Sequence, residues 1–283
     1  MLKSHPFSRV DELLHLSFIC NTYLKDKEGG VSKIKKVINY LAILTLFLCG
    51  GIIILSKTNS SPASSQTVST SKAKVVLAEA ELSTNKLIDV PLENQNTGEI
   101  PLENGCEITA LSMLLNYYGY GTNKNDLAER LNYVPLYEDE AADIHGNPHD
   151  GFVGNIYEGY EAMGVAVEPI AEVANDIVQD NQTVVASSDT SFEELTTIVQ
   201  AGSPVWVVTT VDFQIPTADD LQIWQTTSGE VEISSLCHAV VITGVDEENV
   251  YVNDPYGYKN RIVDRNDFEE IYQLMGSESL YLI

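Results

Sequence analysis

The sequence predicts an α+β fold in which a helix precedes an antiparallel sheet. A helix is expected over residues 107–118, because apolar residues recur there at helical spacing before Gly119. Three later runs rich in β-branched residues predict strands at 204–211, 238–245 and 250–253. The last two runs are separated by a short polar turn, so we expect them to form a hairpin. A helix followed by consecutive strands is typical of α+β domains.

The remaining periodic segments fit the same layout. They are short helices at 126–131 and 192–200, a helix at 266–274 with Asn266 or Asp267 as its cap, and a closing strand at 279–283. The pattern therefore continues to the end of the sequence.

The charge of the chain excludes one class of function. The 283 residues contain 16 Lys and Arg against 41 Asp and Glu, a formal net charge of −25. Nucleic-acid binding needs basic side chains that contact phosphates, so no nucleic acid is expected as a partner. Residues 87–283 hold five of the basic and 35 of the acidic residues, and they are numerous enough for one buried core. We expect this stretch to be the functional domain.

Three different segments precede that domain. The nineteen residues 37–55 carry no charge and match a hydrocarbon core of about 30 Å. Three lysines just before them place residues 1–36 in the cytoplasm and the domain outside the cell. Residues 56–86 are rich in Ser and Thr, which is typical of a flexible linker. We therefore expect 37–55 to be a transmembrane segment or a signal sequence at the cell membrane.

Two alternatives remain open for this region. A cleaved signal sequence shares the basic region and apolar core of an anchor, and cleavage would make the domain a secreted protein. Part of the tail 1–36 is also compatible with a misplaced translation start, because VSKIKKVINYL from Val31 resembles the beginning of a signal sequence.

The first candidate site residue is Cys106, in the sequence NGCE at the start of the first predicted helix. A helix N-terminus favours negative charge, and together with a nearby cation it lowers a thiol pKa from about 8.5 to roughly 3.5–7.5. Gly105 allows a tight turn and leaves space around the sulfur. The pattern is compatible with a reactive thiolate and also with a buried structural cysteine.

His238 and Asp254 lie at the two outer ends of the predicted hairpin. Antiparallel strands return to the same edge, so we expect the two side chains to meet there. Asp254 can then hydrogen-bond one imidazole nitrogen while the other nitrogen faces a thiol. With Cys106, these residues would supply a nucleophile, a base and an orienting group.

The residues around these positions resemble the C39-like cysteine peptidases. The resemblance is carried by NGCEITALSMLLNYYG, HAVVITGVDEENVYVNDPYG and NDFEEIY, in the order Cys, His, Asp. It extends over roughly 87–283, and NPHDGFVGNIYEGYEAMGVAVEPI resembles the middle segment of stand-alone bacterial members. It implies a papain-like fold, in which a helix carrying Cys106 packs on a sheet carrying His238 and Asp254. It also implies that these residues are the nucleophile, the general base and the orienting residue.

By the same resemblance, a glutamine upstream of the nucleophile donates a hydrogen bond to the oxyanion. Gln95 is the candidate, and its amide would act together with the backbone N–H of Cys106. The interval between the two residues is longer than the family pattern, so an exposed loop amide is the alternative. Asn94 and Asn96 are the next candidates for the donor.

Other polar residues have a weaker case. His145 and His149 have the spacing of two metal ligands on a helix, but the glycine and proline between them favour a solvated loop. Cys237 precedes the candidate base on a strand and points to the other face, so we expect a small core residue. There is no Gly-rich phosphate loop, so neither a nucleotide nor a transporter module is expected. No cofactor or metal is predicted.

These observations predict a membrane-anchored or secreted cysteine peptidase that hydrolyses a bond in a peptide or protein. A cysteine amidase, a peptidoglycan endopeptidase or a transpeptidase would share the same three residues. A catalytically silent domain that binds a surface partner in its cleft is an alternative from a different class.

Overall fold

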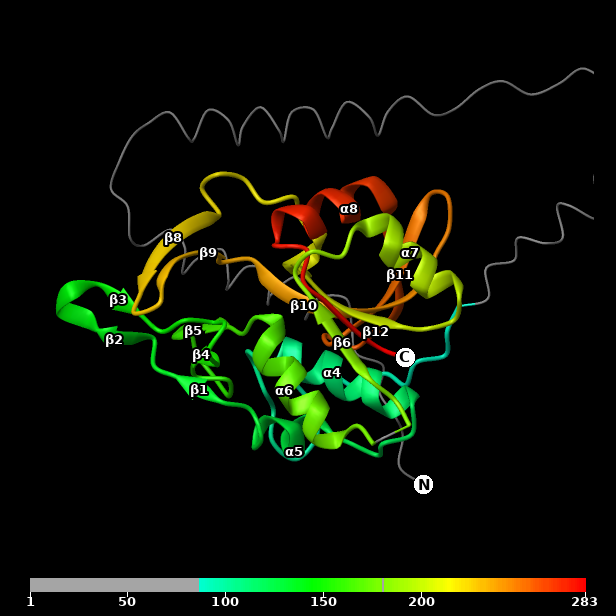
Figure 1. Cartoon of the computed structure of the whole chain (residues 1–283), viewed down its shortest axis with the longest axis horizontal. Helices are drawn as coiled ribbons and strands as arrows, with labels where there is room; N and C mark the ends of the chain where they lie inside the picture. The colour runs from blue at the N-terminus through cyan, green and yellow to red at the C-terminus, as the bar shows by residue number, and fades with distance from the viewer. Residues whose placement is uncertain (1–86, 180) are drawn as a thin grey trace, which may run out of the picture. The chain divides into compact units, whose positions relative to one another are not determined.

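The computed structural model describes residues 87–179 and 181–283 (Figure 1). The predicted tail, apolar segment and linker, residues 1–86, lie outside the described residues. Within those residues, no helix combines the length and the apolar character needed to cross a membrane.

A six-stranded sheet forms the centre of the domain, in the order β12-β11-β10-β7-β13-β6. All neighbouring strands in it are antiparallel. The strands are β6 (Val184–Ser187), β7 (Val205–Thr210), β10 (Cys237–Val245), β11 (Asn249–Asp254), β12 (Tyr258–Asp264) and β13 (Ser279–Leu282). The four strands predicted from the sequence are confirmed as β7, β10, β11 and β13, with ends that agree to within one residue.

Helices cover both faces of this sheet. The helices are α4 (Cys106–Tyr117), α5 (Lys124–Ala128), α6 (Val167–Ile177), α7 (Phe192–Gln200) and α8 (Arg265–Leu274). The first three lie on one side of the sheet, and α7 and α8 lie on the other (Figure 1). A helix that carries the candidate nucleophile therefore packs on the strand that carries the candidate base.

Short strands form two smaller sheets beside the central one. Their orders are β1-β4-β5 and β2-β3-β8-β9. The elements are β1 (Tyr133–Val134), β2 (Tyr137–Asp139), β3 (Ile144–His145), β4 (Phe152–Gly154), β5 (Ala162–Gly164), β8 (Leu221–Thr226) and β9 (Gly229–Ser234), with short 3₁₀ turns at Glu140–Ala142 and Val211–Phe213. They lie together at the left of Figure 1.

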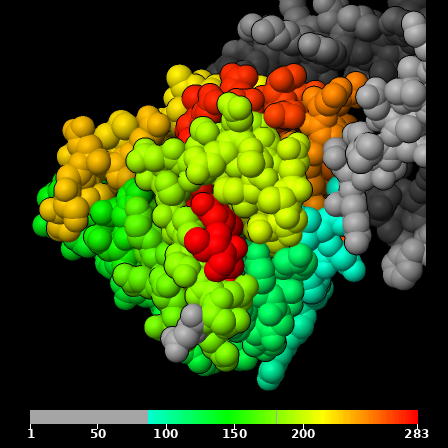
Figure 2. All heavy atoms as spheres, turned by 45° about the vertical axis from the view of Figure 1, so that its right-hand side comes forward, coloured from blue at the N-terminus to red at the C-terminus, as the bar shows by residue number. Residues whose placement is uncertain are grey.

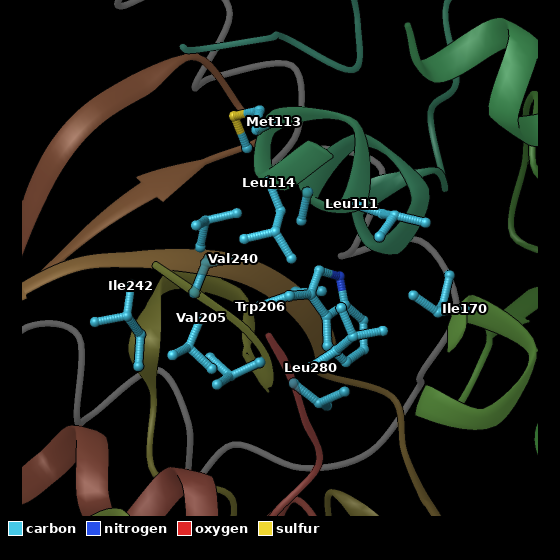
Figure 3. Packing of buried hydrophobic residues seen from close by; sticks show 14 of the residues in the cluster. Leu111, Met113, Leu114, Ile170, Val205, Trp206, Val240, Ile242 and Leu280 are labelled. Atoms are coloured by element: carbon cyan, nitrogen blue, oxygen red, sulfur yellow. The ribbon is translucent and has the colours of Figure 1, made fainter. Parts of the chain in front are cut away.

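The core fills the space between α4 and the sheet. Leu111 and Leu114 point from α4 towards Val240 of β10 and Trp206 of β7 (Figure 3). Residues 106–115 of α4 are all buried, so this helix is enclosed rather than amphipathic. The indole N–H of Trp206 donates to the backbone oxygen of Glu107 over 2.9 Å, which ties the first turn of α4 to the sheet.

Strand β13 completes the sheet between β7 and β6. The red C-terminal residues reach the surface in Figure 2, where yellow-green residues surround them. The exposed end residue, Ile283, exchanges backbone hydrogen bonds with Thr183. The predicted closing strand is thus an internal strand of the sheet.

Two helix boundaries differ from the prediction. Helix α5 begins at Lys124 because the side chain of Asn123 accepts the backbone N–H groups of Asn125 and Asp126. Helix α8 is capped by Asp264, and not by either residue of the expected pair. Strand β12 runs directly into α8, so the last carboxylate of the strand becomes the cap.

Candidate active site

The candidate nucleophile occupies the first turn of α4. Cys106 is 8% exposed, and Gly105 precedes the helix without any side-chain cap. A Cβ atom on Gly105 would lie 2.5 Å from the Cβ of Leu102, so this close approach requires glycine. The first backbone N–H groups of a helix have no partner within the helix. The N–H of Cys106 is therefore free to bind a negatively charged oxygen.

The predicted hairpin brings the candidate base and its carboxylate together. The Nε2 atom of His238 lies 3.0 Å from Oδ1 of Asp254, and both residues are 1% exposed. The other carboxylate oxygen, Oδ2, accepts a hydrogen bond from Arg261 over 2.9 Å. Tyr256 stacks on the imidazole, with ring centroids 4.9 Å apart and planes at 17°. The ring is thus fixed by one edge contact and one face contact.

Burial opposes the ionised form of Asp254, but its hydrogen bond and charge interaction with His238 and the contact with Arg261 outweigh that effect. Together they hold the pKa of this carboxyl below its usual value. Arg261 itself also pairs with Asp212 over 3.1 Å. The carboxylate beside the imidazole is therefore ionised at neutral pH.

The remaining imidazole nitrogen is available for chemistry. Nδ1 of His238 is buried and has no hydrogen-bond partner among the described residues. When Nε2–H donates to Asp254, Nδ1 carries the lone pair and can accept a proton. The neighbouring residue on β10, Ala239, donates its backbone N–H to the sulfur of Cys106. The thiol therefore lies against the beginning of β10, the strand that carries His238.

A buried glutamate lies beside the thiol. Glu107 is 1% exposed, and its Oε2 accepts the Cys106 thiol hydrogen over 3.2 Å. Its Oε1 accepts the backbone N–H of Val165 over 3.3 Å. Gly164 makes room for this carboxylate, since a Cβ at that position would lie 2.3 Å from Oε1. In the free protein, the thiol hydrogen is thus directed to Glu107.

The pKa of the Cys106 thiol is shifted in the direction opposite to the shift that a helix N-terminus favours. Burial raises the pKa of the Cys106 thiol well above its usual value, and the charges of Glu107 and Cys237 raise it further. Burial also raises the pKa of the Glu107 carboxyl. In the free protein, desolvation and the adjacent carboxylate therefore favour the protonated thiol, against the effect of the helix dipole.

Gln95 lies close to both halves of the site. It is 1% exposed, and its backbone N–H donates to the oxygen of Pro255, next to Asp254. Its amide nitrogen donates to the backbone oxygens of Leu102 and Glu103, over 3.2 Å and 2.8 Å. The alternative of an exposed loop amide is therefore wrong. The amide holds the loop before Cys106, and its role as an oxyanion donor stays a prediction.

The other polar residues from the sequence have separate environments. His145 stacks on Trp224 with ring centroids 3.9 Å apart, and His149 pairs with Glu168 over 2.9 Å. His145 belongs to strand β3, so the expected loop is partly a strand. The described residues contain no group of three or more His, Cys, Asp or Glu side chains placed to hold a metal. Cys237 is half-buried, packs against the core and lines two cavities.

A cavity of about 520 Å³ opens beside the candidate nucleophile. Its lining includes Asn104, Glu107, Gly164, Cys237 and Tyr256. It is large enough for several substrate atoms, and it gives a peptide access to the first turn of α4.

The arrangement fits nucleophilic acyl transfer. A thiol at a helix N-terminus, an oriented imidazole with a vacant nitrogen and a free backbone N–H are the groups that such a reaction needs. Three residues of the site were not expected from the sequence: Glu107, Tyr256 and Arg261. The carboxylate of Glu107 follows the nucleophile directly in the chain, but an acidic residue in a first helical turn is usually a solvated one.

Comparisons with known proteins show which family and which solved structure the chain is similar to. Residues 87–280 match the family model described as Peptidase_C39 like family. The uncharacterized protein YvpB of Bacillus subtilis (strain 168) is 40% identical over 200 residues, which cover 70% of this chain and 76% of that protein. A crystal structure from Bacillus anthracis, named as a candidate C39-like peptidase, is 33% identical with a TM-score of 0.65. It covers 71% of this chain and 98% of its own.

Proposed function

Because the chain belongs to the Peptidase_C39 like family, we propose that it is a cysteine peptidase in which Cys106 attacks a peptide carbonyl. The observation that carries this proposal is the unpaired, buried Nδ1 of His238, whose other nitrogen is held by Asp254. An imidazole oriented in this way, next to a thiol at a helix start, is suited to accept the thiol proton.

The first step transfers the thiol proton to Nδ1 of His238, and the thiolate attacks the carbonyl carbon. Asp254 stabilises the imidazolium that forms, because its carboxylate stays ionised. The imidazolium then protonates the leaving amine. Water, deprotonated by the same nitrogen, releases the acyl group from Cys106. A transpeptidase would differ only in using an amine instead of water at the last step.

The oxyanion would accept hydrogen bonds from the backbone N–H of Cys106 and from the side-chain amide of Gln95. A donor of this kind contributes about 2.7–4 kcal/mol to catalysis. The amide of Gln95 currently bonds the oxygens of Leu102 and Glu103. To serve as the donor, it must exchange one of these bonds for the oxyanion when substrate binds.

Turnover of a peptide library by the full chain tests this proposal. The wild type should cleave peptides, and a Cys106→Ala variant should not. A matched Cys237→Ala variant should retain cleavage, because this thiol lacks an oriented imidazole. Cleavage that survives in Cys106→Ala would contradict the proposal.

One observation favours a second candidate, a silent domain that binds peptides in its cleft. The Cys106 thiol donates a hydrogen bond to Glu107 and burial raises the thiol pKa, so the protonated thiol is favoured in the free protein. Binding without any turnover, equal in the wild type and in Cys106→Ala, would support this candidate. A cysteine amidase would instead release ammonia or an amine from non-peptide amides.

We further propose that residues 37–55 keep the protein at the cell membrane, with the domain outside. This proposal is supported by the uncharged segment and the three lysines that precede it. Protease added to intact cells should digest the domain and leave the tail 1–36 protected. A domain that is digested only after lysis would overturn this orientation.

A further inference from the structure

We infer that a second cavity, which adjoins the cavity at the first turn of α4, takes a basic substrate side chain, of Lys or Arg type, and that Glu278 selects it. This inference rests on the proposed peptidase function. It assigns a substrate class to the same site.

The second cavity adjoins the first one, because four residues line both. It has a volume of about 330 Å³ and shares Met163, Ile233, Ser234 and Cys237 with the cavity beside the nucleophile. It is also lined by Val165, whose N–H holds the carboxylate of Glu107. A peptide bound at Cys106 can therefore extend a side chain into this space.

The walls of the cavity suit an aliphatic chain. They are formed by apolar residues from several elements: Met163, Val165, Val208, Leu221, Val231 and Met275. Lys and Arg side chains bury their methylene groups along such surfaces and keep a charged group at the end. The volume is within the usual range of ligand pockets.

Three carboxylates are among the polar groups that line the cavity. Glu278 lines it, and its Oε2 accepts the backbone N–H of Val167 over 2.6 Å. Among residues 87–179 and 181–283, no donor bonds the other oxygen, Oε1, which can accept a hydrogen bond from a ligand. The exposed Glu230 and Glu232 add carboxylates from β9. No Lys or Arg lines either cavity.

The only cationic group in the cavity wall is already paired. His149 lines the cavity, but its Nδ1 lies 2.9 Å from Oε2 of Glu168. His149 also interacts with the charge of Glu278, but its imidazole is held by Glu168. A cation from the substrate would thus meet a Glu278 carboxylate that forms no ion pair with Lys or Arg among the described residues. An acidic side chain would meet several carboxylates, so it is excluded by repulsion.

Glu278 also caps α6 through Val167, so a purely structural role must be distinguished. That role predicts an effect on unfolding and no effect on which peptides are cleaved. Selection predicts an effect on the ratio between basic and neutral substrates. The ratio is the decisive measurement, because a loss of folded protein lowers both rates equally.

The experiment measures cleavage by the full chain in two stages. Unstructured peptides are digested, and mass spectrometry maps every bond that the wild type cuts and Cys106→Ala does not. We expect Lys and Arg to be enriched at one fixed position relative to the cleaved bond. Peptides with Lys, norleucine or Glu at that position are then compared by kcat/KM.

Glu278→Gln should lower the preference for Lys over norleucine by about 10- to 100-fold, with norleucine cleavage retained. Glu172→Gln, an exposed residue of α6, is the matched control and should leave the ratio unchanged. If Glu278→Gln does not fold, a double variant of the exposed Glu230 and Glu232 to Gln should lower the same ratio several-fold.

The outcomes separate the two proposals. Cleavage that depends on Cys106 without enrichment of basic residues overturns the selection of a basic side chain and leaves the peptidase standing. Enrichment that persists unchanged in Glu278→Gln overturns the assignment of this residue. Absence of any cleavage that depends on Cys106 overturns the peptidase, and with it the inference.

Discussion

Replacing Glu107 by Gln should lower the pKa of the Cys106 thiol. The carboxylate oxygen lies 3.2 Å from the sulfur and accepts its hydrogen, which stabilises the protonated thiol. Gln keeps the size of the side chain and can still accept the N–H of Val165. It removes the negative charge, and its N–H₂ group can donate to a thiolate. The perturbation is therefore electrostatic with little change of shape.

The magnitude follows from the distance. Two unit charges 3.2 Å apart repel by about 5 kcal/mol at an effective dielectric constant of about 20. The carboxylate charge is shared by two oxygens, so about half of this energy is expected to disfavour the thiolate. The thiolate fraction below the thiol pKa should then rise about 100-fold. A less basic thiolate is also a weaker nucleophile, which lowers the rate of each thiolate about 10-fold. The alkylation rate of Cys106 should therefore rise by about 10-fold in total.

Alkylation of the full chain by iodoacetamide measures this effect. Peptide mapping gives the rate for each cysteine, and the rate against pH gives the thiol pKa. At about pH 8, Cys106 should react about 10-fold faster in Glu107→Gln than in the wild type. Glu99→Gln, an exposed neighbour in sequence, is the control and should leave the rate unchanged. An unchanged or higher thiol pKa in Glu107→Gln would show that the Glu107 carboxylate does not stabilise the protonated thiol.

Three further predictions concern stability and pH. Arg261→Gln should lower the free energy of unfolding by about 1–3 kcal/mol in urea, because Asp254 loses a charged partner. The pKa of Asp254 is lowered in the folded protein, so this carboxylate contributes to the free energy of unfolding above about pH 4, and the contribution is lost as the pH falls further. The acid-dependent loss of stability should be smaller in Arg261→Gln. Gln95→Ala should lower kcat by about 10²–10³ and the free energy of unfolding by about 1–3 kcal/mol, since the backbone oxygens of Leu102 and Glu103 each lose a donor. An unchanged kcat would contradict the donor role. Burial raises the pKa of Glu278 to about 7 against the opposing charge of His149, so the preference for Lys substrates should weaken as the pH falls below 7.

The central secondary structure could be predicted because its patterns are local and strong. Helix α4 and the strands β7, β10 and β11 lie where the helical spacing of apolar residues and the β-branched runs predict them. Strands β8 and β9 could not be predicted in this way. They are half-exposed and contain few apolar residues in alternation, and they pair with each other outside the central sheet.

The contact between His238 and Asp254 could be predicted from the hairpin, because antiparallel pairing fixes which ends meet. The state of the thiol could not be predicted. It depends on the burial of Cys106 and on a carboxylate held by Val165, a residue far along the chain. Helix position favours a thiolate, and only the folded environment shows that desolvation outweighs it. Arg261 reaches Asp254 from the third strand of the same meander, a contact that no local pattern indicates.

The most direct test of the proposed reaction is detection of the acyl group on Cys106. The full chain is mixed with a cleaved peptide, quenched with acid during turnover and analysed by mass spectrometry. If Cys106 is the nucleophile, the added mass should equal that of the N-terminal fragment of the peptide minus one water, mapped to Cys106 and missing from Cys106→Ala. Turnover without this adduct, or an adduct mapped to Cys237, would contradict the assignment of Cys106 as the nucleophile.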